Sequence, residues 1–253
     1  MSSSYPGGPH ELGQNFLIDR TTIDTVHRSV ATTNGPIVEL APGDGAVTMP
    51  LSRLARPLTA VELDPKRARR LDRRTPEHVT VVISDLLQYR LPHEPHVIVS
   101  NVPFHLTTPL FRRLLAAPHW RTAVLLVQWE VARRRAGVGG ASMLTASWWP
   151  WYEFTLLTRV PSRSFRPLPS VDAGLITVRR REQPLVHARK PYQHFVREVF
   201  TGRGRGIRDI VVRTGRLDRG RLDRWLREQD VPARALPKDL TAAQWAALWR
   251  LAR

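Results

Sequence analysis

The sequence predicts an α/β fold with an open, mostly parallel sheet of seven strands, followed by a smaller region made only of helices. Between residues 37 and 178, short apolar runs alternate with amphipathic helical segments, which is the pattern of strand–helix–strand units. From about residue 184 the apolar spacing becomes purely helical. With 42% hydrophobic residues among 253, the chain can bury one large core and a small additional one.

The composition indicates a polyanionic partner. The formal net charge is +17, and nearly all positive residues are arginines. Arginine stacks on bases and grips phosphate, which suits RNA, although a GC-rich coding sequence would also enrich arginine. Cysteine is absent, which excludes disulfides, thiolate nucleophiles and Cys-ligated metals and favours a cytoplasmic protein. The chain has no long apolar run, so we expect no membrane contact.

The expected elements can be taken in chain order. Residues 1–10 form a flexible tail, and the first helix follows the loop 13–17 with Thr21 as its cap. We expect Asp64 to cap the helix after the second strand, and Thr241 and Gln244 to form a capping box at the start of the last helix. We expect one domain over residues 11–183 that carries the sheet and a helical domain over 184–253. The seven predicted strands are Ile37–Leu40, Leu58–Glu62, Val79–Ile83, His96–Ser100, Ala123–Val127, Phe154–Arg159 and Leu175–Val178.

Two features after the first two strands indicate a nucleotide-like cofactor. The loop Ala41–Gly45 opens a helix, and its glycines let the backbone approach a ligand. Glu62 ends the second strand 19 residues after Gly43, the spacing at which an acid can hold the hydroxyls of a ribose. The loop alone is a weak signal because Ala41 replaces the first glycine of the usual pattern.

The third and fourth strands also end in polar residues. Asp85 follows the third strand and can either accept the exocyclic amine of an adenine or cap a turn. Asn101 ends the fourth strand. Because the carboxyl ends of parallel strands meet at one edge of a sheet, we expect these residues to line one crevice with Gly43 and Glu62.

The tetrapeptide Asn101–Phe104 suits a flat heterocycle that carries an amino group. The Oδ1 atom of Asn101 and the carbonyl of Val102 can accept both hydrogens of an exocyclic amine. Pro103 stiffens the turn, and Phe104 can stack on the ring. For an isolated match, a turn with one inward aromatic ring is the simpler explanation.

Arginine-rich segments are the candidates for contact with RNA. One follows the fifth strand and can be a solvated helix face or a phosphate contact. The loop Phe165–Pro169, stiffened by two prolines, holds a second candidate. The glycine-rich loop 202–206 holds two more, and the last candidate follows it. The arginines expected to contact RNA are Arg133, Arg134, Arg135, Arg166, Arg203, Arg205 and Arg208.

Taken together, these motifs resemble those of the rRNA adenine N6-methyltransferases, which depend on S-adenosylmethionine (AdoMet). That family includes the Erm enzymes of macrolide–lincosamide–streptogramin B resistance and the housekeeping KsgA enzymes. The N-V-P-F form at residue 101 is closer to Erm than to the N-L-P-Y form usual in KsgA. The resemblance rests on Q-N-F-L at 14–17, E-L-A-P-G-D-G at 39–45, V-E-L-D at 61–64, S-D-L at 84–86, N-V-P-F at 101–104, Q-W-E-V-A-R at 128–133 and F-R-P-L-P-S-V-D at 165–172.

The resemblance implies a role for each matched position in a Rossmann-like class I methyltransferase sheet. Asn101 would border the transferred methyl group, with Val102 and Pro103 beside it, while Phe104 and Phe165 would enclose the target adenine. The implied AdoMet contacts are Gln14, Asn15 and Leu17 over the cofactor, Ala41 and Gly43 at its methionine part, Glu62 and Leu63 at the ribose, Asp85 and Leu86 at the adenine, and Asn101.

The resemblance also implies a function. The chain would add one or two methyl groups to N6 of a single-stranded adenine in a loop of 23S rRNA, acting as a monomer without a metal ion. A KsgA-like enzyme acting on small-subunit rRNA is the nearest alternative. An rRNA-binding assembly factor on the same scaffold is a more distant alternative, because every expected cofactor position looks intact. A nicotinamide dehydrogenase is also more distant, because no proton donor is evident.

Overall fold

A computed structural model describes residues 15–253 of the chain. The described chain forms two compact units, one made of residues up to 132 and 155–179, the other of residues 133–154 and 180–253. The expected boundary between domains after residue 183 stays a prediction. Gln14 and the expected tail over residues 1–10 lie outside the described residues. No helix in the part that the structure describes is long and apolar enough to cross a membrane.

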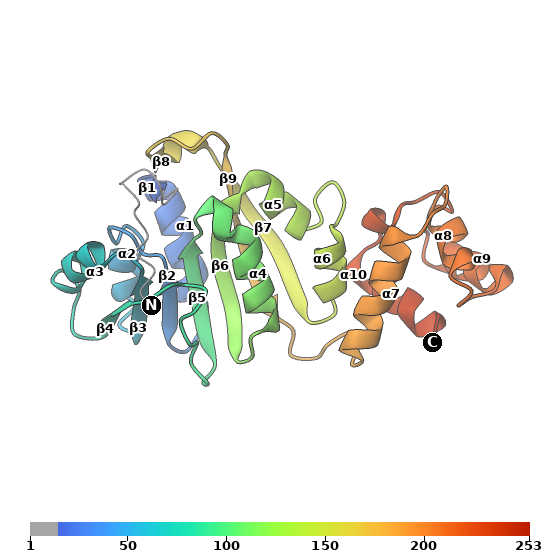
Figure 1. The fold of residues 1–253 in the computed structure, drawn as a ribbon, viewed down its shortest axis with the longest axis horizontal. Helices are drawn as coiled ribbons and strands as arrows, with labels where there is room; N and C mark the ends of the chain where they lie inside the picture. The colour runs from blue at the N-terminus through green and yellow to red at the C-terminus, as the bar shows by residue number, and fades with distance from the viewer. Residues whose placement is uncertain (1–14) are drawn as a thin grey trace, which may run out of the picture. The chain divides into compact units, whose positions relative to one another are not determined.

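A seven-stranded sheet has the order β4-β3-β2-β5-β6-β9-β7, as Figure 1 shows. Strands β2 to β6 pair in parallel, whereas β9 runs antiparallel to β6. The predicted number and mostly parallel order of strands are confirmed. The bounds are β2 Ile37–Leu40, β3 Leu58–Glu62, β4 Val79–Ile83, β5 His96–Asn101, β6 Trp120–Gln128, β7 Tyr152–Val160 and β9 Ala173–Arg180.

Helices connect the parallel strands and contribute to the core. Helix α1 packs against α2 and β6, and α3 packs against β3 and β4. Buried Val26 and Val30 of α1 join apolar residues of β2, β5 and β6 in one cluster, whose burial favours folding of this unit. The helices are α1 Arg20–Ala31, α2 Thr48–Ser52, α3 Pro65–Asp72, α4 Thr107–Ala116 and α5 Trp129–Arg135, with one turn η1 at Phe104–Leu106.

Two details at helix starts test the local predictions. Asp64 accepts the N–H groups of Lys66 and Arg67 at the start of α3, so its predicted cap is confirmed. The predicted Thr21 cap is wrong: Asp19 is the cap and accepts the N–H of Thr22 at 2.8 Å. An aspartate in extended backbone reaches this N–H at least as well as a threonine, and it begins the helix earlier.

A second, two-stranded sheet was not predicted. Strand β1 (Phe16–Leu17) pairs antiparallel with β8 (Phe165–Arg166), so that Leu17 lies opposite Phe165. A single turn, η2 (Ser162–Ser164), precedes β8. The N–H of Ile18 also donates to the carbonyl of Ser164 at 2.8 Å. This pairing ties the chain that precedes α1 to the loop between β7 and β9.

The second unit is built around aromatic side chains. Tyr192 and Phe195 of α7 pack against Trp245 and Trp249 of α10 in one buried cluster. The predicted capping box of Thr241 and Gln244 at the start of α10 is confirmed, with both hydrogen bonds present. The helices are α6 Met143–Trp148, α7 Arg189–Thr201, α8 Ile207–Arg213, α9 Arg219–Glu228 and α10 Ala242–Leu251, with one turn η3 at Pro237–Asp239.

Candidate active site

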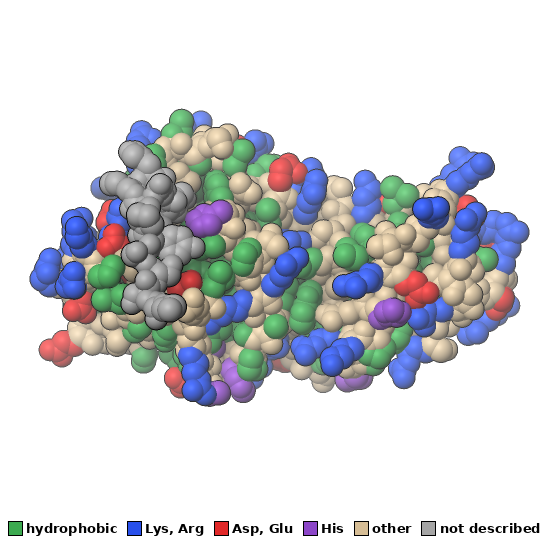
Figure 2. All heavy atoms as spheres, viewed as in Figure 1, with side chains coloured by type: hydrophobic (Ala, Val, Ile, Leu, Met, Phe, Trp, Pro, Cys, Tyr) green, Lys and Arg blue, Asp and Glu red, His purple; other side chains and the backbone are tan. Residues whose placement is uncertain are grey.

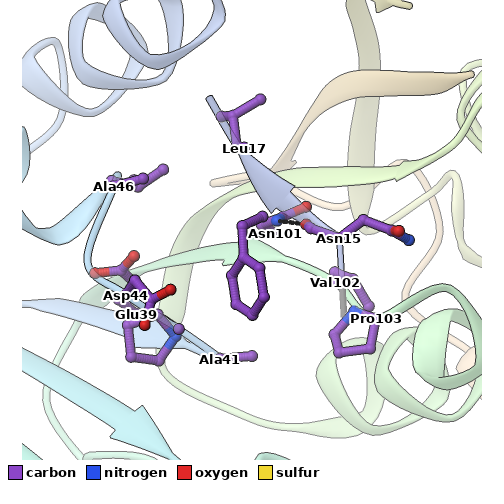
Figure 3. Close-up of a pocket in the computed structure, with 13 residues that line it drawn as sticks. Asn15, Leu17, Glu39, Ala41, Asp44, Ala46, Asn101, Val102 and Pro103 are labelled. Carbon is purple, nitrogen blue, oxygen red and sulfur yellow. Dashed lines mark hydrogen bonds between the residues drawn. The ribbon is translucent and has the colours of Figure 1, made fainter. Parts of the chain in front are cut away.

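The carboxyl ends of β2 to β5 meet at two adjoining hollows that share Ala41 and Pro103. The first hollow, shown in Figure 3, takes in the predicted residues Asn15, Leu17, Ala41, Gly43, Asn101, Val102 and Pro103. The second takes in Ala41, Glu62, Leu63, Asp85, Leu86 and Pro103. Apart from Gln14, which is not described, all the positions predicted to bind the cofactor therefore line one of the two hollows.

Three residues of the glycine loop, Ala41, Gly43 and Gly45, have a left-handed backbone. Ala41 has φ of 59° and Gly43 has φ of 58°. A glycine adopts this conformation freely, whereas alanine at a left-handed φ costs about 1 kcal/mol. A Cβ atom on Gly43 would lie 2.8 Å from the ring of Phe16, so only glycine fits beneath that ring. The loop can thus present its backbone to the first hollow.

Glu62 braces this loop from the neighbouring strand. Its Oε2 accepts the N–H of Gly43 at 2.9 Å, and its Oε1 accepts the N–H of Asp64 at 2.9 Å. The residue is buried yet lines the second hollow. Each carboxylate oxygen can accept a second hydrogen bond, so Glu62 can hold hydroxyl groups without releasing the loop.

Asp85 caps a turn at the end of β4. Its Oδ1 accepts the N–H of Leu87 at 2.7 Å, which is one of the two roles expected from the sequence. The residue also lines the second hollow beside Leu63, whose side chain is largely exposed. A carboxylate next to an exposed leucine can accept an amine while the leucine contacts the flat face of a ring.

Asn101 has an amide whose orientation is determined by one hydrogen bond. Its Nδ2 donates to the carbonyl of Asn15 at 2.8 Å, as Figure 3 shows. A carbonyl cannot donate, so Nδ2 must be the atom that faces Asn15, and Oδ1 points elsewhere. Oδ1 accepts no hydrogen bond from the part of the chain that the structure describes. It is therefore available to a donor in the first hollow.

A model of the ribosomal RNA adenine dimethylase family matches residues 9–251 of this chain. The chain belongs to that family. The mycinamicin-resistance protein MyrB of Micromonospora griseorubida is 54% identical over 250 residues, which cover 98% of this chain and 80% of MyrB. An rRNA adenine N-6-methyltransferase of Corynebacterium diphtheriae is 51% identical over 216 residues, covering 84% and 85% of the two chains. The crystal structure of the 23S rRNA methyltransferase ErmE matches with a TM-score of 0.86 at 33% identity, covering 94% of this chain and 99% of that one.

These comparisons confirm the family that the sequence motifs resemble, the enzyme class and the fold. The hollows at the carboxyl ends of the strands therefore belong to an rRNA adenine methyltransferase. The roles of individual residues in this methyltransferase stay predictions, and the structure supports them unequally.

The two aromatic residues predicted to enclose a base differ in position. Phe104 is half-buried in η1, next to the first hollow. Phe165 is fully buried in the apolar cluster with Leu17 and Leu175, because the pairing of β1 with β8 draws it inward. The structure of the methyltransferase does not bring Phe165 to the crevice, and stacking on a base would require its ring to leave this cluster.

Sequence reasoning missed Glu39, the acid in the middle of β2. The residue is 3% exposed, lines the first hollow, and its Oε2 has no hydrogen-bond partner among the described residues. Burial raises the pKa of Glu39 to about 7, and the charge of Glu62 adds to the rise. A charged residue inside the otherwise apolar run Ile37–Leu40 was the signal that could have revealed it.

Phe16 is the second residue that the sequence did not single out. Its ring contacts Gly43, and the guanidinium of Arg67 lies 4.4 Å from the ring centroid. Arg67 in turn pairs with Asp44 of the glycine loop at 2.6 Å. The position of Phe16 inside the Q-N-F-L motif was the only signal in the sequence.

The predicted RNA-contacting arginines fall into two groups. Arg134, Arg166, Arg203 and Arg205 are exposed, and Figure 2 shows basic side chains spread over the visible surface of both units. Arg135 is 9% exposed, and its Nη1 donates to the Ser142 hydroxyl at 2.6 Å. The structure therefore does not bring Arg135 to the surface. Arg133 is half-buried, and half-buried Arg208 forms a two-pronged ion pair with Asp223.

Proposed function

We propose that this chain transfers methyl groups from AdoMet to N6 of one adenine in a loop of 23S rRNA, and so confers resistance to macrolide, lincosamide and streptogramin B antibiotics. The observation that carries the proposal is the amide of Asn101, which lines the first hollow and whose Oδ1 accepts no hydrogen bond from residues 15–253. The names of MyrB, a resistance protein, and ErmE, a 23S rRNA methyltransferase, support the choice of substrate.

The residues present fit AdoMet. The first hollow contains a buried carboxylate oxygen of Glu39 that has no hydrogen-bond partner among residues 15–253, and this oxygen is suited to the cationic amino end of the cofactor. The second contains Glu62 for the ribose and Asp85 for the adenine amine, with Leu63 and Leu86 on the ring. Ala41 borders both hollows, so a ligand that spans them passes over the glycine loop. AdoMet supplies an electrophilic methyl group on a sulfonium.

The protein's own contribution to the reaction is to shape and aim the nucleophile. The lone pair of adenine N6 is delocalised into the ring, which makes the amine a poor nucleophile. Asn101 Oδ1 and the Val102 carbonyl would accept its two hydrogens, draw N6 towards tetrahedral geometry and aim the lone pair at the methyl group. No general base is needed before attack, because the cationic product loses its proton easily. Half-buried Phe104 would cover one face of the base.

The RNA must present its adenine outside a stack. A single-stranded loop makes this extrusion cheap, and it explains the preference expected for a loop over a duplex. The net charge of +17 supplies backbone affinity that weakens with salt. We expect the enzyme to act as a monomer in the cytoplasm, where ribosomes are made.

The test supplies AdoMet with a tritiated methyl group to the purified protein with separated 23S and 16S rRNA. Label in an adenine of 23S rRNA alone supports the proposal. Label in 16S rRNA alone would indicate a KsgA-like enzyme instead, and no label in either RNA would favour an assembly factor. AdoMet, but not NAD, should raise the melting temperature of the protein; the reverse result would support a dehydrogenase.

A further inference from the structure

A third hollow lies on the same unit, at the carboxyl end of β6, and shares no residue with the two hollows described above. It is lined by Gln128–Glu130, Arg159 and Ser170–Asp172. Strand β6 is the direct neighbour of β5, and Leu126 pairs with Asn101. Gln128 stands two residues beyond Leu126, about 7 Å along the strand. The third hollow therefore adjoins the point at which Asn101 would hold the target adenine.

Arg159 is held in this hollow by an aromatic ring and a carboxylate. Its guanidinium carbon lies 5.1 Å from the centroid of the Trp129 ring. Its Nε donates to Oδ2 of Asp172 at 2.8 Å, and its Nη2 lies 2.8 Å from the same oxygen in an ion pair. The other oxygen of Asp172 accepts the N–H of Ser162 at 2.8 Å, a bond that, with Arg159, lowers the pKa of this carboxyl. Arg159 is thus fixed in place.

Trp129 is likewise held in place, by the segment from Asp172 to Gly174. Its backbone N–H donates to the backbone carbonyl of Asp172 at 2.9 Å. A Cβ on Gly174 would lie 2.4 Å from the Cβ of Ala132 and 3.4 Å from Cε3 of Trp129, so the absence of a side chain lets this segment pack onto β9. Trp129 supports Arg159, whose side chain remains 59% exposed.

The chemistry of the hollow favours a base over a phosphate. The charge of Arg159 is already paired with Asp172, and the hollow contains a second carboxylate, Glu130. A guanidinium plane stacks readily on a nucleobase, and the Gln128 amide can pair with a base edge. Val171, 43% exposed, adds an apolar rim. A surface built only to grip the RNA backbone would instead present unpaired cations.

We propose that the third hollow binds the base of a nucleotide adjacent to the target adenine, stacked on the Arg159 guanidinium that Trp129 supports. This inference rests on the proposed function and adds to it the part of the substrate that fixes which adenine is chosen. Reading a neighbouring base holds the strand in register, so that only one nucleotide can reach Asn101.

The experiment uses a short hairpin RNA that carries the target adenine, and two versions in which the nucleotide on its 5′ or its 3′ side lacks a base. With the unaltered enzyme, loss of one of these bases should lower kcat/KM for methyl transfer about tenfold, the size of one stacking contact. Arg159→Lys keeps the positive charge but removes the planar guanidinium on which a base would stack. It should lower kcat/KM about tenfold on the intact hairpin and show no further loss on the abasic one.

The matched control is Arg121→Lys, an exposed arginine at the opposite end of β6, which should retain the full sensitivity to base loss. If Arg159 only fastened β7 to β9, Arg159→Lys would lower transfer equally on all hairpins, and that result would overturn the proposal. Insensitivity of the unaltered enzyme to both abasic changes would also overturn it. Failure of the unaltered enzyme to methylate the intact hairpin would instead contradict the proposed function, on which this subsite depends.

Discussion

The sheet edge and the helical unit use polar side chains in opposite ways. At the sheet edge, Glu62 and Asn101 are tied to backbone groups of neighbouring segments and still turn an oxygen towards a hollow. In the helical unit the core cluster is apolar and aromatic, and several charged side chains form ion pairs with each other, as Arg208 does with Asp223. The first arrangement suits chemistry at fixed positions, and the second suits a charged surface.

This difference predicts how each region responds to substitution. A change at the sheet edge should affect methyl transfer far more than RNA binding, because backbone-anchored groups act on one bound atom. A change on the helical unit should affect RNA affinity and its salt dependence, because surface charges act additively and at a distance. The variants below test this contrast, from the largest expected effect to the smallest.

Asn101→Ala should lower the rate of methyl transfer by about 10²- to 10³-fold, the usual loss when one positioned polar group is removed from a reacting centre. RNA affinity, followed by fluorescence anisotropy, should stay within about twofold. Asn101→Asp is the matched control, since it keeps an acceptor but loses the donor to Asn15. Its rate of methyl transfer should lie between those of the unaltered enzyme and Asn101→Ala. Transfer at an unchanged rate in Asn101→Ala would contradict the role assigned to this amide.

Glu39→Gln should remove a pH dependence of stability that is present in the unaltered protein. The pKa of Glu39 is raised from 4.5 to about 7. Between these pH values the folded protein keeps a proton that the unfolded chain releases, so the free energy of unfolding falls as pH rises, by about 3 kcal/mol in total. Urea titrations from pH 4.5 to 8 should show this slope in the parent and lose it in Glu39→Gln. An exposed control, Glu77→Gln, should retain it.

The same group should link pH to cofactor affinity. Ionised Glu39 attracts the cationic end of AdoMet, so the dissociation constant measured by calorimetry should decrease as pH rises through about 7. In Glu39→Gln the affinity should be weaker and flat over this range. An affinity that falls with rising pH in the parent would exclude Glu39 as the partner of that cationic group.

The sequence predicted the features that depend on neighbours in the chain. The cap at Asp64 and the capping box at Thr241 involve residues two or three positions apart, so spacing alone determines them. The polar strand ends were predicted for a related reason: parallel strands put their carboxyl ends on one edge whatever the details of packing. Gly43, Glu62, Asp85 and Asn101, which line the two hollows, follow from this rule.

The features that the sequence did not predict depend on contacts between distant segments. Phe165 is buried because β8 pairs with β1, whose residues precede it by about 150 positions. Arg135 belongs to a run of three arginines that look alike in sequence, and only the fold decides that this one turns inward to Ser142. Charged and aromatic residues can be counted from a sequence, but whether one of them is buried depends on which distant segment packs against it.

The double variant Arg203→Ala/Arg205→Ala should weaken RNA binding through charge alone. Both side chains are exposed on the loop before α8. If each neutralises one phosphate, the slope of log affinity against log salt should become shallower by about 1.5. Arg208→Ala, only three residues away, should change this slope little and instead lower the melting temperature, since it leaves Asp223 without its partner. An equal loss of slope in Arg208→Ala would contradict this assignment.

Ala41→Gly should have the smallest effect and should act on the fold rather than on chemistry. Ala41 holds a left-handed φ of 59° at the junction of the two hollows, in the place of the first glycine of the usual motif pattern. Relief of this strain favours the variant by about 1 kcal/mol, while the greater freedom of glycine in the unfolded chain removes about half of that gain. The melting temperature should therefore rise slightly, with the rate of methyl transfer unchanged. A marked loss of stability would mean that the methyl group of Ala41 makes packing contacts that outweigh its backbone strain.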